Sequence, residues 1–240
     1  MEHGTNGLSV NDRPKKFRHE LKYKIPYSDY LAMKSRLSHV MKRDPHTDAD
    51  GTYIIRSIYF DNTEDKALKE KIQGIQKREK FRIRYYNDDL SRITLEKKMK
   101  INRLCLKYSA PLTEDECRKI LAGDISWMKT HPSELVREFY AKLRYLRLKP
   151  RVTVSYVREP YIYVPGNVRV TFDSKIRSSM YSRDFLEPDL SDISATDAPD
   201  DMILEVKYDE FLPEVIRNLI QVKDLKQESF SKYGICRRFG

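Results

Sequence analysis

The chain has few cysteines, no long apolar runs and no secretory signal. Its three cysteines, Cys105, Cys117 and Cys236, are odd in number, widely spaced and without a C-x-x-C pair. This argues against a disulfide framework or a zinc site and fits a reducing compartment. No apolar run approaches the roughly 18 residues of a membrane span, and residues 1–16 lack a signal-peptide core. We expect a cytoplasmic protein with a flexible leader over 1–16 and a single domain over 17–240.

Positive charge is in excess. The 240 residues include 46 Lys and Arg against 36 Asp and Glu, which gives a net charge of +10. Such a balance favours anionic partners: nucleic acid, phosphates or an anionic membrane surface. Composition alone does not choose among them. The apolar content of 40% fits a globular domain that can bury a core.

Several strand-like segments carry charged residues on one face and apolar residues on the other. Residues 81–85, Phe-Arg-Ile-Arg-Tyr, are the clearest case, because alternation along a strand places Arg82 and Arg84 on the same side. The same pattern recurs over residues 17–25, 95–100, 154–158, 168–173 and 204–207, and its polar members include Arg18, Glu20, Lys22, Lys24, Glu96, Lys98, Lys100, Tyr156, Arg158, Arg169, Thr171, Asp173, Glu205 and Lys207. Like charges on neighbouring strands destabilise a sheet. Their accumulation indicates a surface that holds a polyanion.

The hydrophobic pattern predicts an α+β fold. Strands are expected over residues 17–25, 53–60, 77–87, 92–100, 103–109, 151–157, 161–164, 168–172 and 202–208, and helices over 28–41, 62–72, 113–122, 132–146 and 213–222. The third helix begins with a capping box, Thr113 to Glu116, and the acidic segment 184–201 is predicted to be a mobile loop. About eight strands with one charged face predict a closed antiparallel β-barrel that forms a basic tunnel, with helices packed around the outside. Closure would remove exposed sheet edges.

Five short motifs carry a family resemblance. They are Glu20-Leu21-Lys22, Arg82-Ile83-Arg84, Leu95-Glu96-Lys97-Lys98, Ile203-Leu204-Glu205-Val206-Lys207 and Phe230-Ser231-Lys232-Tyr233. In this order they resemble the catalytic domain of the vacuolar transporter chaperone (VTC) complex, a polyphosphate polymerase of the triphosphate tunnel metalloenzyme superfamily. Each motif alone is weak, and the ordered set covers the chain from residue 17 to about residue 233.

The resemblance implies that the chain transfers the terminal phosphoryl group of ATP to a growing inorganic polyphosphate chain with Mn²⁺ or Mg²⁺. The implied partners are ATP and inorganic polyphosphate or pyrophosphate, with no nucleic acid. The phosphate-binding residues, to which we add Arg56, are Lys22, Arg56, Arg82, Arg84, Lys98, Lys107, Tyr156, Arg158, Arg169, Ser231 and Lys232. The catalytic set is Lys22, Arg82, Arg84, Lys98, Arg158, Arg169 and Glu205. Glu205 is the implied metal ligand, with Glu20 and Glu96 as further candidates.

The chain departs from the family pattern in two motifs. The superfamily's first strand carries Glu-x-Glu-x-Lys, whereas Arg18 stands here in the place of the first carboxylate. This puts a two-metal site in doubt. Ser229 stands where the family can carry a lysine before the last motif. The eukaryotic proteins add a phosphate-sensing domain and membrane helices, which this sequence does not contain, so we keep open a membrane-protein partner at the inner face of a membrane.

Other functions remain open at this level. A phosphohydrolase of the same tunnel fold would cleave triphosphate or nucleoside triphosphates, and a non-catalytic protein would only bind polyphosphate. A nucleic-acid binder fits the charge, but no recognition motif can be named. Glu205 with Lys207 is by itself more typical of a surface ion pair than of a site. A site is favoured because, on several predicted strands, the charged residues occupy alternate positions and so lie on one face.

Overall fold

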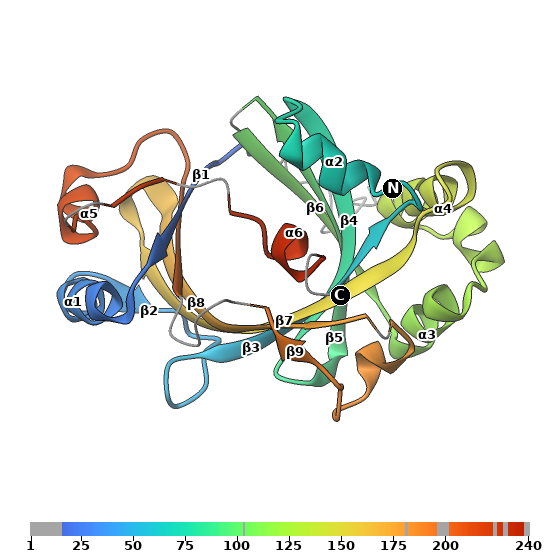
Figure 1. Ribbon diagram of the computed structural model, residues 1–240, viewed down its shortest axis with the longest axis horizontal. Helices are drawn as coiled ribbons and strands as arrows, with labels where there is room; N and C mark the ends of the chain where they lie inside the picture. Colours follow the sequence, from blue (N-terminus) through green and yellow to red (C-terminus); the bar gives the residue numbers. More distant parts are fainter. Residues whose placement is uncertain are drawn as a thin grey trace, which may run out of the picture.

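One curled antiparallel sheet dominates the computed structural model, which describes residues 16–102, 104–180, 182–195, 202–222, 225–227 and 230–237. Helices cover the convex face, and one short helix lies within the curl (Figure 1). The long strands, in spatial order, are β1 (His19–Ile25), β10 (Met202–Tyr208), β8 (Val168–Ser179), β7 (Lys149–Tyr163), β3 (Tyr53–Asp61), β4 (Lys77–Tyr86), β5 (Asp89–Ile101) and β6 (Leu104–Leu112). Two short strands, β2 (Lys42–Arg43) and β9 (Ile193–Ser194), pair with β7 and β8.

The sheet does not close into a barrel, so the predicted closed barrel is wrong. Between its edge strands β1 and β6 there is one isolated bridge among the described residues, from Arg18, just before β1, to Cys105 of β6. Further along β1, Tyr23 forms a bridge with Gln227, in the segment that precedes the last helix. This returning segment occupies part of the edge that β6 would need for closure. The α+β class and the antiparallel order are confirmed.

The predicted strands 151–157 and 161–164 are one continuous strand, β7. Pro160 lies between Arg158, which pairs with β3, and Tyr161, which pairs with β2. The neighbour of β7 therefore changes at the proline. Proline has no backbone N–H, and this is tolerated where the hydrogen-bond ladder is interrupted. The strand therefore continues through Pro160.

Six α-helices are present among the described residues. They are α1 (Tyr27–Ser38), α2 (Lys66–Ile72), α3 (Glu114–Ala122), α4 (Glu134–Tyr145), α5 (Glu214–Leu219) and α6 (Lys232–Cys236). The capping box of α3 is confirmed, because the Thr113 hydroxyl accepts from the Glu116 N–H and the Glu116 carboxylate accepts from the Thr113 N–H. Gly123 ends this helix with φ of 86°. Across the described parts of the chain, no helix is both long and apolar enough to span a bilayer.

Three apolar clusters hold the helices to the sheet. One packs α3 and α4 against the convex face of β4 and β5, and a second packs α1 and α5 against β8 and β10 (Figure 1). The third lies inside the curl, where Tyr233 and Cys236 of α6 contact apolar residues such as Ile55 and Val154. The interior is thus apolar beneath α6 and charged elsewhere. Burial of α6 fixes the last motif of the chain against the concave face.

Parts of two predicted segments lie outside the described residues. These are residues 1–15 of the leader and residues 196–201 of the acidic loop, and Ser229 also falls outside. The described part of the acidic segment is ordered into secondary structure, with a 3₁₀ turn over Ser182–Leu186 and strand β9. Strand β9 pairs with β8, which ties this segment to the sheet.

Candidate functional site

Charged side chains from several strands converge on two joined cavities at the concave face. The inner cavity, of about 50 Å³, is lined by eight cationic side chains and two carboxylates. The cations are Lys22, Lys80, Arg82, Arg84, Lys98, Arg158, Lys207 and Lys232, and the carboxylates are Glu20 and Glu205. A larger cavity of about 350 Å³, here called the lysine mouth, shares Lys22, Lys80 and Lys98 with it and adds Lys71, Arg78 and Lys100. The excess of cations makes the joined cavities suited to an anion with several charges.

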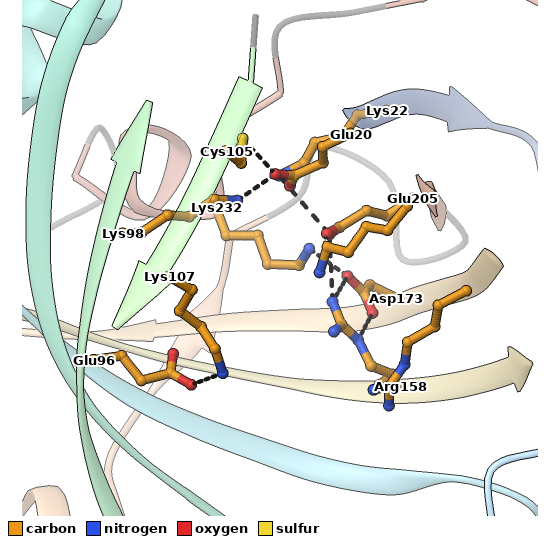
Figure 2. A network of polar contacts seen from close by, with 12 residues as sticks. Glu20, Lys22, Glu96, Lys98, Cys105, Lys107, Arg158, Asp173, Glu205 and Lys232 are labelled. Atoms are coloured by element: carbon orange, nitrogen blue, oxygen red, sulfur yellow. Dashed lines mark hydrogen bonds and ion pairs between the residues drawn. The ribbon is translucent and has the colours of Figure 1, made fainter. Parts of the chain in front are cut away.

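Glu20 and Glu205 each lie between cations from neighbouring strands (Figure 2). The Lys22 ammonium is 3.0 Å from Glu20 Oε1 and 3.8 Å from Glu205 Oε2. Lys98 pairs with Glu20, and Lys207 lies 2.5 Å from Glu205 Oε1. Because β1 pairs with β10 in a register that places Lys22 opposite Glu205, the two strands build this cluster directly. The predicted grouping of Lys22, Lys98, Glu20 and Glu205 is therefore present.

Arg158 connects this cluster to a buried carboxylate, Asp173. Its guanidinium donates to Asp173 Oδ1 at 2.6 Å and Oδ2 at 2.7 Å, and it lies 3.4 Å from Glu205 Oε2 (Figure 2). Lys232 of α6 also pairs with Asp173. The Tyr156 ring lies beneath both cations, 5.3 Å from the Arg158 Cζ and 4.6 Å from the Lys232 Nζ. A fork of this kind holds Arg158 in one orientation.

Arg82 and Arg84 project from β4 into the inner cavity, as predicted. Arg82 donates from Nε to Glu96 Oε2 at 2.7 Å and from Nη1 to the Tyr59 hydroxyl at 2.9 Å. Arg84 donates to Tyr156 Oη at 3.1 Å. Lys107 donates to the other oxygen of Glu96 at 2.8 Å. Both oxygens of Glu96 accept from cations, so Glu96 orients Arg82 and Lys107.

Burial and neighbouring charge act in opposite directions on the two carboxylates. Burial raises the pKa of Glu205, but Lys207 and Lys22 outweigh it and hold that pKa well below its usual range. Burial likewise raises the pKa of Glu20, and Lys22 and Lys98 together bring it below its ordinary value. Both carboxylates are therefore ionised at neutral pH, because the cations around them stabilise the charged form.

Burial and neighbouring positive charge shift the pKa values of three further groups. Burial raises the pKa of Tyr59, but Arg82 and Lys80 outweigh it and lower this pKa to about 7. Burial lowers the pKa of Lys80 to about 8, aided by nearby lysines. Burial also lowers the pKa of Lys207 to about 8, although Glu205 opposes the shift. The cavity therefore holds cations that are close to losing their protons, which is expected where like charges face one another.

Arg56 is not part of this site. It projects from β3 to the convex face, where it donates to the Tyr85 hydroxyl at 2.8 Å and to the carbonyl oxygens of Glu187 and Pro188. The prediction assumed that Arg56 shared a face with the phosphate ligands. On β3 the inward positions are instead occupied by residues such as Ile55 and Tyr59. The structure therefore places Arg56 apart from the other predicted phosphate ligands.

Two other predicted ligands lie at the margin of the cluster, and one lies within it. Arg169 donates to Asp44 Oδ2 and to the Tyr53 hydroxyl, both at 2.6 Å, and lines a separate cavity. The side chain of Lys107 is 54% exposed. Ser231 lines both joined cavities and accepts from the Gly234 N–H at the start of α6.

Four residues of the site were not predicted as site residues. They are Lys80, Lys207, Asp173 and Tyr59. Three of them lie on the same face of their strand as a predicted residue: Lys80 with Arg82, Lys207 with Glu205, and Asp173 with Arg169. Applying the alternation rule consistently along each strand would have found these three. Tyr59 gave no such signal, since the wrong face of β3 was taken as the inner one.

The carboxylates of the inner cavity fit a hard divalent cation in donor type. Mg²⁺ and Mn²⁺ prefer oxygen ligands, and Mg²⁺ is commonly held by one or two carboxylates together with substrate phosphates. Glu20 Oε1 is buried and faces the Lys22 ammonium at 3.0 Å. No ready-made group of three His, Cys, Asp or Glu side chains occurs in the described part of the chain. Glu205 and Glu20 would hold such an ion together with a bound phosphate.

Comparisons with known proteins identify one family. The family described as VTC domain matches residues 17–239. A search of curated proteins gives no match.

Three solved structures resemble the fold. A candidate adenylate cyclase from Bacillus halodurans is 19% identical with a TM-score of 0.46, over 80% of this chain and 81% of that chain. A protein of Pyrococcus horikoshii is 14% identical with a TM-score of 0.48, over 93% and 99%. A candidate adenylate cyclase from Vibrio parahaemolyticus is 9% identical with a TM-score of 0.49, over 92% and 98%. Likenesses of this size imply no shared activity.

Proposed function

Because the chain belongs to the VTC domain family, we propose that it is a polyphosphate polymerase, which transfers the terminal phosphoryl group of ATP to a growing inorganic polyphosphate chain. The observation that carries this proposal is the inner cavity, where eight cations and only two carboxylates line one small space. A triphosphate or polyphosphate is a dense row of negative charge, so it matches this excess. Arginine forks match phosphate oxygens in pairs, and lysines act as point charges.

The reaction needs positioning and charge neutralisation more than proton transfer. A terminal oxygen of the acceptor phosphate attacks the γ-phosphorus of ATP, the bond from that phosphorus to the bridging oxygen breaks, and ADP leaves with the electron pair. The attacking oxygen is already ionised, so no general base is required. Arg82, Arg84 and Arg158 would hold the equatorial oxygens, and their own partners keep them in position. A bound divalent ion would add neutralising charge at the transferring group.

The carboxylates favour transfer to phosphate over transfer to water. A hydrolase must activate water, commonly with a carboxylate or a metal-bound hydroxide. Here Glu20 and Glu205 are each held by two or more cations, and their pKa values are lowered. Lowered pKa values make both groups weak bases. They suit cation binding and charge balance better than proton abstraction.

A product assay tests the proposed activity. The protein is incubated with ATP and Mn²⁺, in parallel with Mg²⁺, and the products are separated by gel electrophoresis. We expect phosphate chains that lengthen with time, together with ADP. Formation of only ADP and orthophosphate would instead identify a phosphohydrolase. Binding of polyphosphate without any turnover in either metal would identify a non-catalytic binding protein.

ATP binding is expected to weaken as the pH rises above about 8. The pKa values of Lys80 and Lys207 are about 8 in the free protein, and a bound polyanion raises them. Above about 8 each lysine must take up a proton on binding, so affinity falls by up to about tenfold per pH unit for each lysine. Calorimetric titration without divalent metal, in buffers of different ionisation enthalpy, measures both affinity and proton uptake.

A matched variant assigns this pH dependence. Lys80→Arg keeps its charge across the range and is expected to bind with a shallower dependence on pH and with less proton uptake. The terminal phosphate of ATP is ionised well below this range, since phosphate groups lose their second proton near pH ~6. An affinity that stays constant or rises between pH ~8 and ~9.5 would contradict the assignment of these lysines to phosphate binding.

A further inference from the structure

A third cavity, here called the tyrosine pocket, follows the two basic cavities along the same strands. It has a volume of about 400 Å³, and its lining includes Tyr53, Tyr86, Arg92 and Arg169. On β4, alternate residues pass from the lysine mouth at Arg78 to the inner cavity at Arg82 and Arg84, and then to Tyr86. On the paired strand β5 the same order runs backwards from Lys100 and Lys98 to Thr94 and Arg92. The tyrosine pocket therefore lies at the opposite end from the lysine mouth.

The two ends differ in charge. The lysine mouth is lined by six cations and by two carboxylates, Glu20 and Glu79. The tyrosine pocket is lined by two arginines, Arg92 and Arg169, and by two carboxylates, Asp44 and Asp89. A polyphosphate chain carries charge on each phosphate and requires continuous neutralisation. A nucleoside is uncharged, so a pocket with balanced charges can accept it.

Aromatic rings make the tyrosine pocket suitable for a base. The rings of Tyr53 and Tyr86 meet edge to face with centroids 5.5 Å apart. Tyr86 is partly exposed, and its ring lies 5.9 Å from the Arg84 guanidinium carbon. Tyr53 is opposite Arg158 in the ladder between β3 and β7, and its hydroxyl accepts from Arg169. The rings therefore stand directly beside the first phosphate-binding arginines.

The lysine mouth also has two aromatic rings, and both have partners within the protein. The Phe230 ring lies 5.9 Å from Lys232 Nζ, and the Tyr233 ring is stacked on Tyr59 with centroids 5.2 Å apart. The Tyr233 hydroxyl donates to Asp61 at 2.7 Å. This tyrosine is thus occupied by contacts that hold α6 in place, whereas Tyr86 presents part of its surface to its cavity.

We propose that the tyrosine pocket binds the nucleoside of the ATP donor, with the base against Tyr86, and that the phosphates run from Arg84 through the inner cavity towards the lysine mouth. This inference rests on the proposed function, because it assigns the cavities at the two ends of the same strands to the two substrates. Donor and acceptor would enter from opposite ends. Their reacting phosphates would meet among Arg82, Arg84 and Arg158.

Equilibrium binding of ATP and of tripolyphosphate, measured without metal, tests this placement. Stacking of a base on an aromatic ring strengthens binding, so Tyr86→Leu is expected to weaken ATP binding by about tenfold. Binding of tripolyphosphate, which has no base, is expected to change by less than about twofold. Tyr86→Phe retains the ring and should bind ATP like the original protein. Lys100→Met, at the lysine mouth, should weaken long polyphosphate more than ATP.

Photolabelling gives a second measurement that needs no turnover. With 8-azido-ATP, we expect the label on peptides from residues 86–94, whereas a label on residues 67–80 or 98–105 would place the base at the lysine mouth and overturn the inference. Equal weakening of ATP and tripolyphosphate by Tyr86→Leu would also overturn it. If the nucleotide results hold but no chains form in the product assay, the placement stands and the polymerase proposal fails. If phosphate chains form but Tyr86→Leu weakens ATP binding no more than tripolyphosphate binding, the polymerase proposal stands and the placement of the base fails.

Discussion

Glu205→Gln is expected to reduce metal-dependent turnover by about 100-fold or more, a loss typical of removing one essential charge-stabilising group. The amide keeps the shape of the side chain but removes the charge that a divalent cation requires. Binding of tripolyphosphate should persist or tighten, because one negative charge leaves a cavity that is already short of carboxylates. Steady-state rates with ATP and Mn²⁺, together with tripolyphosphate affinity, measure the two effects.

The fold is expected to tolerate this change. Arg158 keeps its two-pronged contact with Asp173. Glu205 is the main group that opposes the lowering of the Lys207 pKa, so without it this pKa falls further and the lysine can become neutral. Glu138→Gln serves as a matched control, since Glu138 pairs with Lys97 of β5 on the helix-covered side. Normal turnover in Glu205→Gln would show that the metal ligand lies elsewhere.

Arg82→Ala is expected to lower kcat/KM for ATP by about 100-fold, equivalent to about 2.7 kcal/mol, because it removes a guanidinium fork from the centre of the inner cavity. The side chain is only 14% exposed and is bound to Glu96 and Tyr59. Loss of a buried partner costs about 3 kcal/mol. Denaturant unfolding should therefore reveal a less stable protein.

Two companion variants separate stability from phosphate binding. Combining Arg82→Ala with Glu96→Gln removes the unpaired charge and should recover part of the stability but none of the ATP affinity. Arg56→Ala, on the convex face, should lose stability through its contacts with Tyr85 and Glu187 while binding tripolyphosphate within about twofold of the original. If Arg82→Ala bound tripolyphosphate normally, its assignment as a phosphate ligand would be wrong.

The alternation of side chains along strands is what made most of the site predictable. Alternate residues of a strand point to the same face, so Arg82 lies with Arg84 on β4 and Glu205 lies with Lys207 on β10. This holds for any position of the two strands in the fold. The capping box at Thr113 was equally local, since all of its contacts fall within one helical turn. Such features depend on neighbouring residues alone, so they survive any arrangement of the sheet.

The sequence by itself thus determined which residues share a face, where α3 begins, and that cations follow the family's order along several strands. Only the tertiary structure decided which face of β3 turns inward, which excluded Arg56 and brought in Tyr59. It also decided that β1 meets Gln227 as well as β6, so the sheet stays open. The geometry of a single strand fixes which of its residues share a face. Closure of the sheet and the face that a strand turns inward depend instead on contacts between residues far apart in the sequence.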